Sequence, residues 1–597
     1  MKRRRPLLVV VAALALAPGP RGAMAAPQEL LGWWTTDALH KVRPADAPGK
    51  RQQVELFAAR NEFEPFQLVL RSDRPVAGVD VDVGPLVPQA PGAGVATTTA
   101  VRATVYFERY VQLRLPSSLE GAAGEWPDPL LPRVDTYSGE RRKAFPFDLA
   151  AGRNQPLWIE LYVPPETPPG DYRGAARVTV QGALVAEVPF ALHVWPFALP
   201  STSSLRTTFG FSAISAAKQH RGAYGGDEDL YRWTDLYGRA ALRHRLSLHG
   251  GSMVPPPATF AGDRATVDWR SYDAEVGPFL DGLAKDRDGG YLPGARFTAI
   301  DLRVPTGLSD AQKIAYWRAW AKHFRERRWM DRLFYYVMDE PEPQDYPRVL
   351  AEARLAHQAD PGIATLLTEQ WVPSLAGAID LWVPLVNLLD AKPDGSEPDA
   401  VARATYAPAE AQGARLWWYQ SCSSHGCDTV GGKEFAGWPS YVIDTPAVGN
   451  RIMPWLAFAE RIGGELYYNT VESYTKNADA WNDPATHGGN GDGTLFYPGT
   501  PARVGGTTDL PIESLRLKLI REGLEDYEYL TLLAKAGRED QARAWAQSLA
   551  PHAAQWEHDP ARLYALRRRI GEAVAAALAK APSATSLASP NGATRCP

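Results

Sequence analysis

The chain lacks a long hydrophobic run and a large net charge. The apolar stretch at residues 7–17 is too short to cross a bilayer as a helix, and no other segment is long and apolar enough. A formal net charge of −4 over 597 residues argues against a nucleic-acid partner held by phosphate contacts. Also missing are the His-Glu-x-x-His, Gly-x-Ser-x-Gly and phosphate-binding Gly-rich motifs, which removes three rival enzyme classes. No cofactor and no integral membrane segment are expected.

Cysteine is scarce, with three residues in the whole chain, so a dense disulfide framework is excluded. Cys422 and Cys427 flank a short Ser-Ser-His-Gly loop, and in an exported chain we expect them to form a disulfide. A zinc site that uses His425 is the alternative, but a fourth ligand is missing nearby, and no metal is expected. Cys596 lies in a Ser/Pro/Ala-rich tail and is expected to be free or disordered.

The N-terminus has the pattern of a signal peptide. Four basic residues at positions 2–5 precede the apolar stretch, and Ala23-Met24-Ala25 fits the small-residue cleavage rule. We expect the mature chain to start near Ala26, and no cysteine follows the apolar stretch to carry a lipid. The sequence therefore predicts a secreted or periplasmic protein.

The composition is that of a globular protein with more than one domain. Hydrophobic residues make up 45% and charged residues 22% of the chain, and 597 residues exceed one ordinary domain. The 19 Trp and 24 Tyr suit sugar binding, because a pyranose has an apolar face that packs on aromatic rings, but they also fill cores. We predict five parts: a signal peptide (1–25), a β-sandwich (26–203), a catalytic barrel (204–508), helices packed on the barrel (509–581) and a disordered tail (582–597).

Residues 26–203 read as short strands separated by Pro/Gly turns, without a long helical pattern. Several strands alternate apolar with polar residues, which is typical of a β-sandwich. Four examples are 66–70, 103–107, 157–163 and 176–180. The segment 195–200 contains two prolines and marks the boundary with the next part.

After residue 204, short apolar strands alternate with helical stretches. The eight predicted strands are 206–211, 245–248, 297–302, 333–338, 365–368, 381–386, 415–419 and 465–469. The predicted helices among them are 229–244, 272–286, 309–327, 345–359 and 447–462. Alternation of strand and helix implies a parallel sheet, and eight units suggest a (β/α)8 TIM-like barrel.

A helical segment follows, from Ser514 to about Lys580, with breaks. It carries four acids that look catalytic at first: Glu522, Glu525, Asp526 and Glu528. A solvated or ion-paired helix face, shared with Arg516 and Arg521, is the favoured interpretation of these acids.

The most informative stretch joins a buried strand to two acids. Residues 333–338 form an unbroken aromatic and apolar run, and Asp339 and Glu340 follow directly before Pro341. Barrel enzymes keep catalytic groups at the carboxyl ends of their strands. Successive strand residues point to opposite sides, so the two acids share one direction only if the backbone twists there. Such a pair can split a glycosidic bond; the alternative is an Asp that caps the next helix, beside a solvated Glu.

Several stretches together resemble glycoside hydrolase family 123 and its uncharacterised relatives. The resemblance runs from the predicted sandwich to the C-terminal helices and so covers most of the mature chain. The stretches that carry it, of which the last two are the most specific, are 59–67, 169–174, 336–341, 493–499 and 514–527. The resemblance implies an N-terminal β-sandwich, a catalytic barrel and retaining, substrate-assisted β-N-acetylgalactosaminidase activity on a GalNAc-terminated glycan. It also implies that Asp339 orients and polarises the 2-acetamido group and that Glu340 is the general acid/base.

Other residues near strand ends are weaker candidates for sugar binding. Tyr419 and Trp418 end the seventh strand, where a Tyr hydroxyl could hydrogen-bond the acetamido oxygen; packing in the core and barrel wall is the alternative. The remaining candidates follow predicted strands or lie in a Gly-rich loop: Glu369, Trp371, Asn469, Glu472 and Asp492. A plain turn residue is the favoured alternative for the last of these.

Three functions remain open at this point. The first is an exported glycosidase that acts on terminal β-linked N-acetylgalactosamine. The second is a non-catalytic carbohydrate-binding or scaffold protein, which would not need the intact Asp339-Glu340 pair. The third is a glycosidase for a sugar without an acetamido group, which would need a separate nucleophile carboxylate, such as Glu369 or Glu472.

Overall fold

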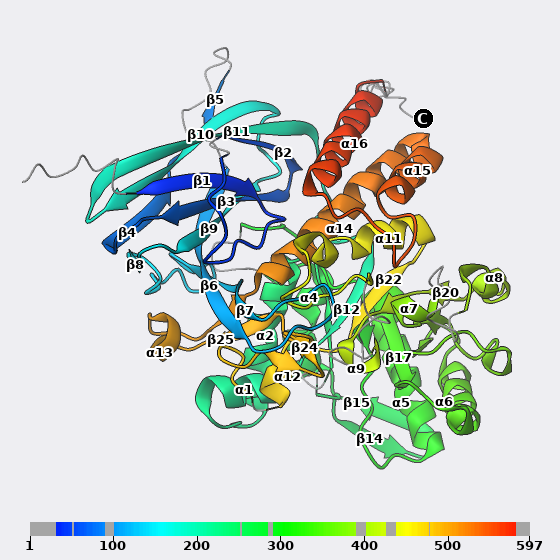
Figure 1. Cartoon of the computed structure of the whole chain (residues 1–597). Coiled ribbons are helices and arrows are strands. Elements are labelled where there is room, and N and C mark those ends of the chain that lie inside the picture. Colours follow the sequence, from blue (N-terminus) through cyan, green and yellow to red (C-terminus); the bar gives the residue numbers. More distant parts are fainter. Residues whose placement is uncertain are drawn as a thin grey trace, which may run out of the picture.

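Figure 1 shows the computed structural model of the chain. It describes residues 31–50, 53–89, 101–250, 254–284, 290–389, 401–425, 437–476 and 478–580. The predicted signal peptide, the predicted disordered tail, Cys427 and Cys596 lie outside these residues, and so does the side chain of His425. Among the helices of the described residues, none combines the length and apolar character that a membrane crossing requires.

The N-terminal part forms two β-sheets. The first is antiparallel, in the order β1 (Gly32–Asp37), β3 (Glu62–Arg71), β9 (Asn154–Val163), β6 (Arg102–Leu113) and β7 (Gly124–Pro132). The second has the order β2 (Val54–Arg60), β11 (Ala183–Ala198), β10 (Gly170–Val180), β4 (Val76–Val83) and β8 (Phe147–Leu149), with β5 (Val87–Pro88) beside β10. All four example strands predicted from the sequence are confirmed, because each lies within β3, β6, β9 or β10. The β-sandwich arrangement itself stays a prediction.

The eight predicted strands after residue 204 are all present as parallel strands. They are β12 (Arg206–Gly210), β13 (Leu248–His249), β16 (Ile300–Asp301), β17 (Leu333–Met338), β18 (Ala364–Leu367), β19 (Leu381–Trp382), β20 (Arg415–Leu416) with β21 (Trp418–Tyr419), and β22 (Gly464–Tyr467). One sheet has the order β13-β12-β22-β21 and the other β16-β17-β18-β19-β20. Because β20 and β21 flank Trp417 in one continuous segment, that segment joins the two sheets. Between β13 and β16 no ladder is formed in the described part of the chain, so the closed barrel stays a prediction.

The helices around these strands are less regular than predicted. They are α1 (Ala213–Arg221), α2 (Asp227–Arg243), α3 (Arg270–Glu275), α4 (Gly277–Asp281), α5 (Asp310–Glu326), α6 (Tyr346–Ala359), α7 (Val386–Leu389), α8 (Ala407–Ala411), α9 (Cys422–His425), α11 (Met453–Glu460), α12 (Glu472–Thr475) and α13 (Pro501–Val504). The single helix predicted at 272–286 is wrong, since Gly277 and Pro278 divide it into α3 and α4. A hairpin of β14 (Ala258–Ala261) and β15 (Arg264–Val267) precedes it.

Shorter elements complete this part of the chain. Two antiparallel pairs are β23 (Ala485–Thr486) with β24 (Gly489–Asn490), and β25 (Phe496–Gly499) with β26 (Leu510–Glu513). Single 3-10 turns are η2 (Met330–Arg332), η3 (Pro343–Asp345), η4 (Pro373–Leu375), η5 (Arg403–Tyr406) and η6 (Ala447–Asn450).

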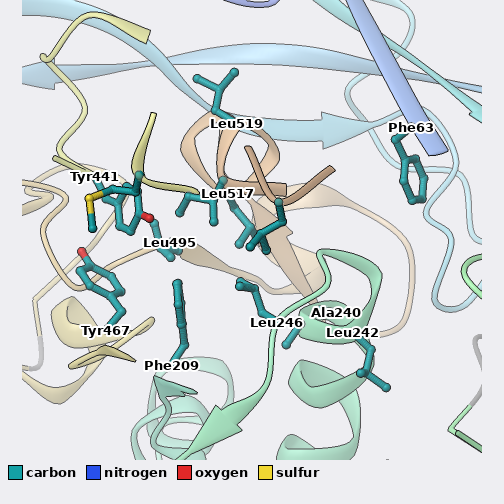
Figure 2. Packing of buried hydrophobic residues seen from close by; sticks show 14 of the residues in the cluster. Phe63, Phe209, Ala240, Leu242, Leu246, Tyr441, Tyr467, Leu495, Leu517 and Leu519 are labelled. Carbon is teal, nitrogen blue, oxygen red and sulfur yellow. The ribbon is translucent and has the colours of Figure 1, made fainter. Parts of the chain in front are cut away.

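The C-terminal helices are α14 (Leu515–Leu533), α15 (Glu539–Leu549) and α16 (Pro560–Lys580), with a π-helical turn η7 (Ala534–Arg538) between the first two. Ser514 caps α14 by accepting a hydrogen bond from Leu517 N. In Figure 1, α14 runs between the N-terminal sheets and the parallel strands. Figure 2 shows its Leu517 and Leu519 packed in one hydrophobic cluster with Phe209 of β12 and Tyr467 of β22. The helix therefore shares a hydrophobic core with strands β12 and β22 of the parallel sheets.

This central position corrects one prediction about α14. The acids Glu522, Glu525, Asp526 and Glu528 are fully buried rather than solvated. Glu522, Glu525 and Asp526 are ion-paired, as the second half of the prediction stated, whereas Glu528 accepts hydrogen bonds from the backbone N and the hydroxyl of Ser204. The helix meets charged residues of the neighbouring parts. Its pairs are Arg516 with Asp128 of β7, Arg521 with Glu160 of β9, Glu525 with Arg245, and Asp526 with Arg451 and Arg567.

Candidate active site

The two adjacent acids lie where the backbone leaves β17 in an unusual conformation. The ladder between β17 and β18 shifts register between Tyr336 and Met338, and Glu340 has a φ of 40°. A non-glycine residue in this left-handed region stores strain that the surrounding structure must hold. The twist reverses the normal alternation of side chains, so Asp339 and Glu340 both line one cavity. This is the twist that the sequence required for a shared site.

The cavity has a volume of about 640 Å³ and lies at the carboxyl ends of the parallel strands. Six strands or the residues directly after them contribute to its wall: β13, β16, β17, β18, β21 and β22. The segment from Ser421 to α9 adds the serines Ser421 and Ser424. This is the end of a parallel sheet at which α/β enzymes place their catalytic groups.

Asp339 is held by two hydroxyl groups. Tyr336 donates a hydrogen bond from its hydroxyl to Asp339 Oδ1 at 2.6 Å, and Thr368 Oγ1 donates to the same oxygen at 3.0 Å. Thr368 Oγ1 also accepts from Glu340 N at 2.9 Å. Burial, and next to it the Asp339 carboxylate, raise the pKa of Tyr336 well above its ordinary value, so the phenol remains a donor at neutral pH. One threonine on β18's end thus fixes both acids.

Glu340 is held from the other side of the cavity. The hydroxyl of Tyr419, at the end of β21, donates a hydrogen bond to Glu340 Oε1, and Ser424 Oγ donates to the same oxygen at 2.5 Å. Burial, followed by the Glu340 carboxylate, raises the pKa of Tyr419 well above its ordinary value. The two acid side chains therefore have separate sets of hydroxyl donors, from different elements of the fold, which gives them different environments within one site.

The structure brings only Tyr419 of the weaker candidates to the cavity wall. Trp418 is fully buried in the core, as alternation along β21 demands. Glu369 Oε1 accepts a hydrogen bond from the adjacent Gln370 N at 2.7 Å, and Trp371 packs against the core. None of these three lines the cavity.

The candidates after β22 lie behind the cavity wall. Asn469 Nδ2 donates a hydrogen bond to Glu472 Oε2 at 2.6 Å, and Glu472 also lies 3.2 Å from His487 Nε2. Asp492 is fully buried and accepts hydrogen bonds from Cys422 N at 3.0 Å, Tyr468 OH at 2.9 Å and Tyr467 OH at 3.2 Å. Because Tyr468 lines the cavity and Cys422 begins α9, Asp492 supports the wall from outside.

Asp492 carries an unusual charge environment for a loop carboxylate. Its complete burial raises the pKa to about 6, although hydrogen bonds from Tyr468, Cys422 N and Tyr467 favour the charged form. Cys422, which this carboxylate anchors, is disulfide-bonded. Its pairing with Cys427 stays a prediction, because Cys427 lies outside the described residues.

Sequence reasoning missed most polar residues of the wall. They are His249, Asp301, Arg303, Tyr335, Tyr336, Thr368, Ser421, Ser424 and Tyr468. A signal for several of them was present near the carboxyl ends of predicted strands: His249 directly follows 245–248, Asp301 is next to last in 297–302, Thr368 ends 365–368 and Tyr468 is next to last in 465–469. Within the described residues, no group of three or more His, Cys, Asp or Glu side chains is arranged to hold a metal ion.

A pair of carboxylates in an open cavity at the carboxyl ends of parallel strands is the kind of site that glycoside hydrolases use. A comparison of the sequence with protein families gives the same class. Residues 312–533 match the model described as "Glycoside hydrolase 123, catalytic domain", a segment that contains both acids. This segment of the chain is therefore similar to the catalytic domain of glycoside hydrolase family 123, which supports a glycoside hydrolase. No protein with a curated function matches the chain.

A solved structure shows the same fold. A family 123 glycoside hydrolase from Clostridium perfringens, studied for glycolipid glycan hydrolysis, superposes with a TM-score of 0.62 at 13% identity. The match covers 91% of this chain and 98% of that enzyme. A Bacteroides ovatus GH5 xyloglucanase gives a TM-score of 0.29 at 10% identity, covering 79% and 98% of the two chains. Only the first of these likenesses is close enough to show a shared fold.

Proposed function

We propose that the protein is an exported exo-glycosidase that releases terminal β-linked N-acetylgalactosamine by a retaining, substrate-assisted mechanism. The observation that carries the proposal is the pair Asp339 and Glu340, which share one cavity while each is oriented by its own hydroxyl donors. The match to the glycoside hydrolase 123 catalytic domain supports the reaction class. The resemblance to that family supplies the sugar.

In the proposed reaction the substrate provides its own nucleophile. The carbonyl oxygen of the 2-acetamido group attacks C1 while the bond from C1 to the leaving oxygen breaks, and Glu340 donates a proton to that oxygen. Asp339 stabilises the positive charge that develops on the amide nitrogen of the cyclic intermediate. Glu340 then takes a proton from a water molecule that attacks C1, and the acetamido group reopens. The configuration at C1 is retained because it is inverted twice.

The contacts of the two acids suit this division of roles. Asp339 receives hydrogen bonds from two strands, through Tyr336 and Thr368, and a fixed carboxylate is what charge stabilisation requires. Glu340 is held through Oε1, whereas general acid/base catalysis needs one carboxyl oxygen for the proton that moves. Tyr419, beside Glu340, is proposed to contact the acetamido oxygen.

The second candidate function is a glycosidase for a sugar without an acetamido group. That reaction needs an enzyme carboxylate as nucleophile across the site. The two acids considered for this role, Glu369 and Glu472, do not line the cavity. Asp301 does line it, but Arg303 Nε lies 2.6 Å from its Oδ2. These positions favour the substrate-assisted reaction.

A panel of 4-nitrophenyl glycosides tests the proposed activity. The expected result is hydrolysis of the β-N-acetylgalactosaminide with retention of configuration. NMR identifies the anomer of the sugar that is released first and so reports the configuration. Hydrolysis of only non-acetamido glycosides would reject the substrate-assisted mechanism. No hydrolysis of any member would favour a carbohydrate-binding protein instead.

Two variants test the roles of the acids. Glu340→Gln removes proton donation, so a substrate with a poor leaving group should lose on the order of a hundredfold or more in rate, and an activated aryl glycoside much less. Asp339→Asn removes the stabilising charge and should slow both substrates by a similar factor, because ring closure accompanies departure of either leaving group. Glu342→Gln, two residues from Glu340 and exposed outside the cavity, is the matched control. The opposite leaving-group pattern would exchange the two roles.

A further inference from the structure

A third carboxylate lies in the cavity wall next to the acid pair. Asp301 ends β16, the strand that pairs with β17, and it is 6% exposed. Its Oδ2 lies 2.6 Å from Arg303 Nε, and both residues line the cavity. The wall at this position therefore offers an acidic acceptor beside a guanidinium donor, which is a combination suited to sugar hydroxyl groups.

The second oxygen of Asp301 is unsatisfied. Asp301 Oδ1 is buried and accepts no hydrogen bond from the described residues. Buried carboxylate oxygens are normally paired, and an exception calls for a missing water or ligand. The neighbouring His249 does not fill this place, since its Nδ1 is 3.0 Å from Thr208 Oγ1 and no hydrogen bond joins its ring to Asp301 Oδ1 within the described residues. Burial lowers the pKa of this histidine.

The order of the strands says which part of a sugar would face Asp301. Glu340 reaches towards β21, Asp339 follows β17, and Asp301 ends β16, which in turn contacts β13. On a pyranose the glycosidic oxygen, the C2 substituent and the C3 and C4 hydroxyl groups follow one another in the same way around the ring. If Glu340 faces the glycosidic oxygen and Asp339 the C2 substituent, the next group along the wall faces C3 and C4.

We propose that Asp301, held by Arg303, accepts a hydrogen bond from the C3 or C4 hydroxyl of the sugar that is released, and so determines which sugar the site accepts. This inference rests on the proposed function, since it uses the roles of Glu340 and Asp339. It adds a substrate-binding residue that selects on the configuration of the ring, separate from the acid pair that acts on the acetamido group and on the leaving oxygen.

The test combines deoxy substrates with variants. With the wild-type enzyme, the 4-nitrophenyl β-N-acetylgalactosaminide should exceed its 3-deoxy or its 4-deoxy analogue in kcat/KM by about 10- to 100-fold, as expected for one hydrogen bond to a charged group. In Asp301→Asn the parent substrate should fall by a similar factor, and the penalty for the missing hydroxyl should shrink to less than about threefold. Asp380→Asn is the control, because this carboxylate is also ion-paired, with His357, but lies outside the cavity.

Each outcome decides the proposal. The proposal is overturned if the wild-type enzyme hydrolyses both the 3-deoxy and the 4-deoxy substrate as well as the parent. It is also overturned if Asp301→Asn keeps the full penalty for the missing hydroxyl. Binding of free N-acetylgalactosamine, measured by calorimetry, provides a readout that does not need turnover; the variant should bind at least about tenfold more weakly than Asp380→Asn. If the wild type hydrolyses only another sugar, the proposed function fails, and the deoxy forms of that sugar then decide the role of Asp301. A wild type that neither binds nor hydrolyses any of these sugars overturns both.

Discussion

Thr368 is the smallest residue on which both acids depend, and its replacement by valine tests the site directly. The substitution keeps the shape of the side chain and removes the hydroxyl. Both acids lose an interaction: the hydrogen bond to Asp339 Oδ1 at 3.0 Å and the one from Glu340 N at 2.9 Å. The 3.0 Å contact between Tyr336 OH and Thr368 Oγ1 is lost as well. Asp339 keeps the hydrogen bond from Tyr336, so the site loses precision rather than its acids.

The magnitude follows from the kind of bond that is lost. A hydrogen bond to a charged group contributes about 1.5–3 kcal/mol and a neutral one about 0.5–1.5 kcal/mol. Both acids are exposed on one side, so water replaces part of these interactions. We therefore expect a net loss of about 1.4–2.8 kcal/mol in the transition state, which corresponds to about a 10- to 100-fold decrease in kcat. KM should change little, because the acids act mainly in the transition state.

Thr365→Val is the matched control from the same strand. Thr365 is fully buried, and its Oγ1 lies 2.7 Å from Ala378 O and 2.9 Å from Asp380 Oδ2, away from the cavity. This variant should lose about 1–3 kcal/mol in the free energy of unfolding while its kcat stays within about twofold. Steady-state kinetics and urea titrations of both variants give the two readouts. If Thr368→Val kept its kcat within twofold of the wild type, the reasoning about the positioning of the acids would be refuted.

Three further predictions concern the support of the site. Burial raises the pKa of the Asp492 carboxyl from 3.8 to about 6. Between about pH 4 and pH 6 the folded chain therefore binds more protons at this residue than the unfolded chain does. The contribution of Asp492 to the free energy of unfolding consequently falls as pH rises. In urea titrations, the stability of Asp492→Asn minus that of the wild type should therefore increase by at most about 3 kcal/mol from pH 4 to pH 7, and a constant difference would contradict this. Arg567→Met removes the ion-pair partner of the buried Glu62 and Glu64 and leaves Asp526 with Arg451, so it should cost about 3–5 kcal/mol in the free energy of unfolding. Arg568→Met, at an exposed neighbour, should cost less than about 1 kcal/mol. Mass spectrometry of non-reduced peptides should show Cys422 joined to Cys427, and two free thiols would exclude this pairing.

Strand positions were predictable from the sequence because each strand is a short apolar run that must be buried. Residues 333–338 coincide with β17, and the position of the two acids at its end followed directly. The conformation of Glu340 was not predictable, because a positive φ in a glutamate is imposed by the surrounding structure and leaves no local signature. The prediction could state only that a twist was required.

Two candidates from the sequence, Glu369 and Trp418, are next to a residue that does line the cavity. The sequence indicated Glu369 after the fifth strand, whereas the adjacent Thr368 lines the cavity. It indicated both Trp418 and Tyr419, of which Tyr419 alone does so. Because side chains alternate along a strand, a shift of one residue exchanges core for cavity. Composition favours aromatic and acidic residues as candidates, and it gives no reason to select a threonine.

The ion pairs along α14 have a consequence for how this chain can be divided. Arg516 meets Asp128 and Arg521 meets Glu160, and all four side chains are buried. If the N-terminal sheets were removed, Arg516 would lose Asp128, and Arg521 would lose Glu160 and keep Glu522, at a cost of several kcal/mol. The N-terminal sheets thus supply carboxylates that neutralise buried arginines of α14. We therefore expect the catalytic region to be inherited and produced only together with the N-terminal sheets. A fragment that begins after residue 203 should be unable to fold by itself.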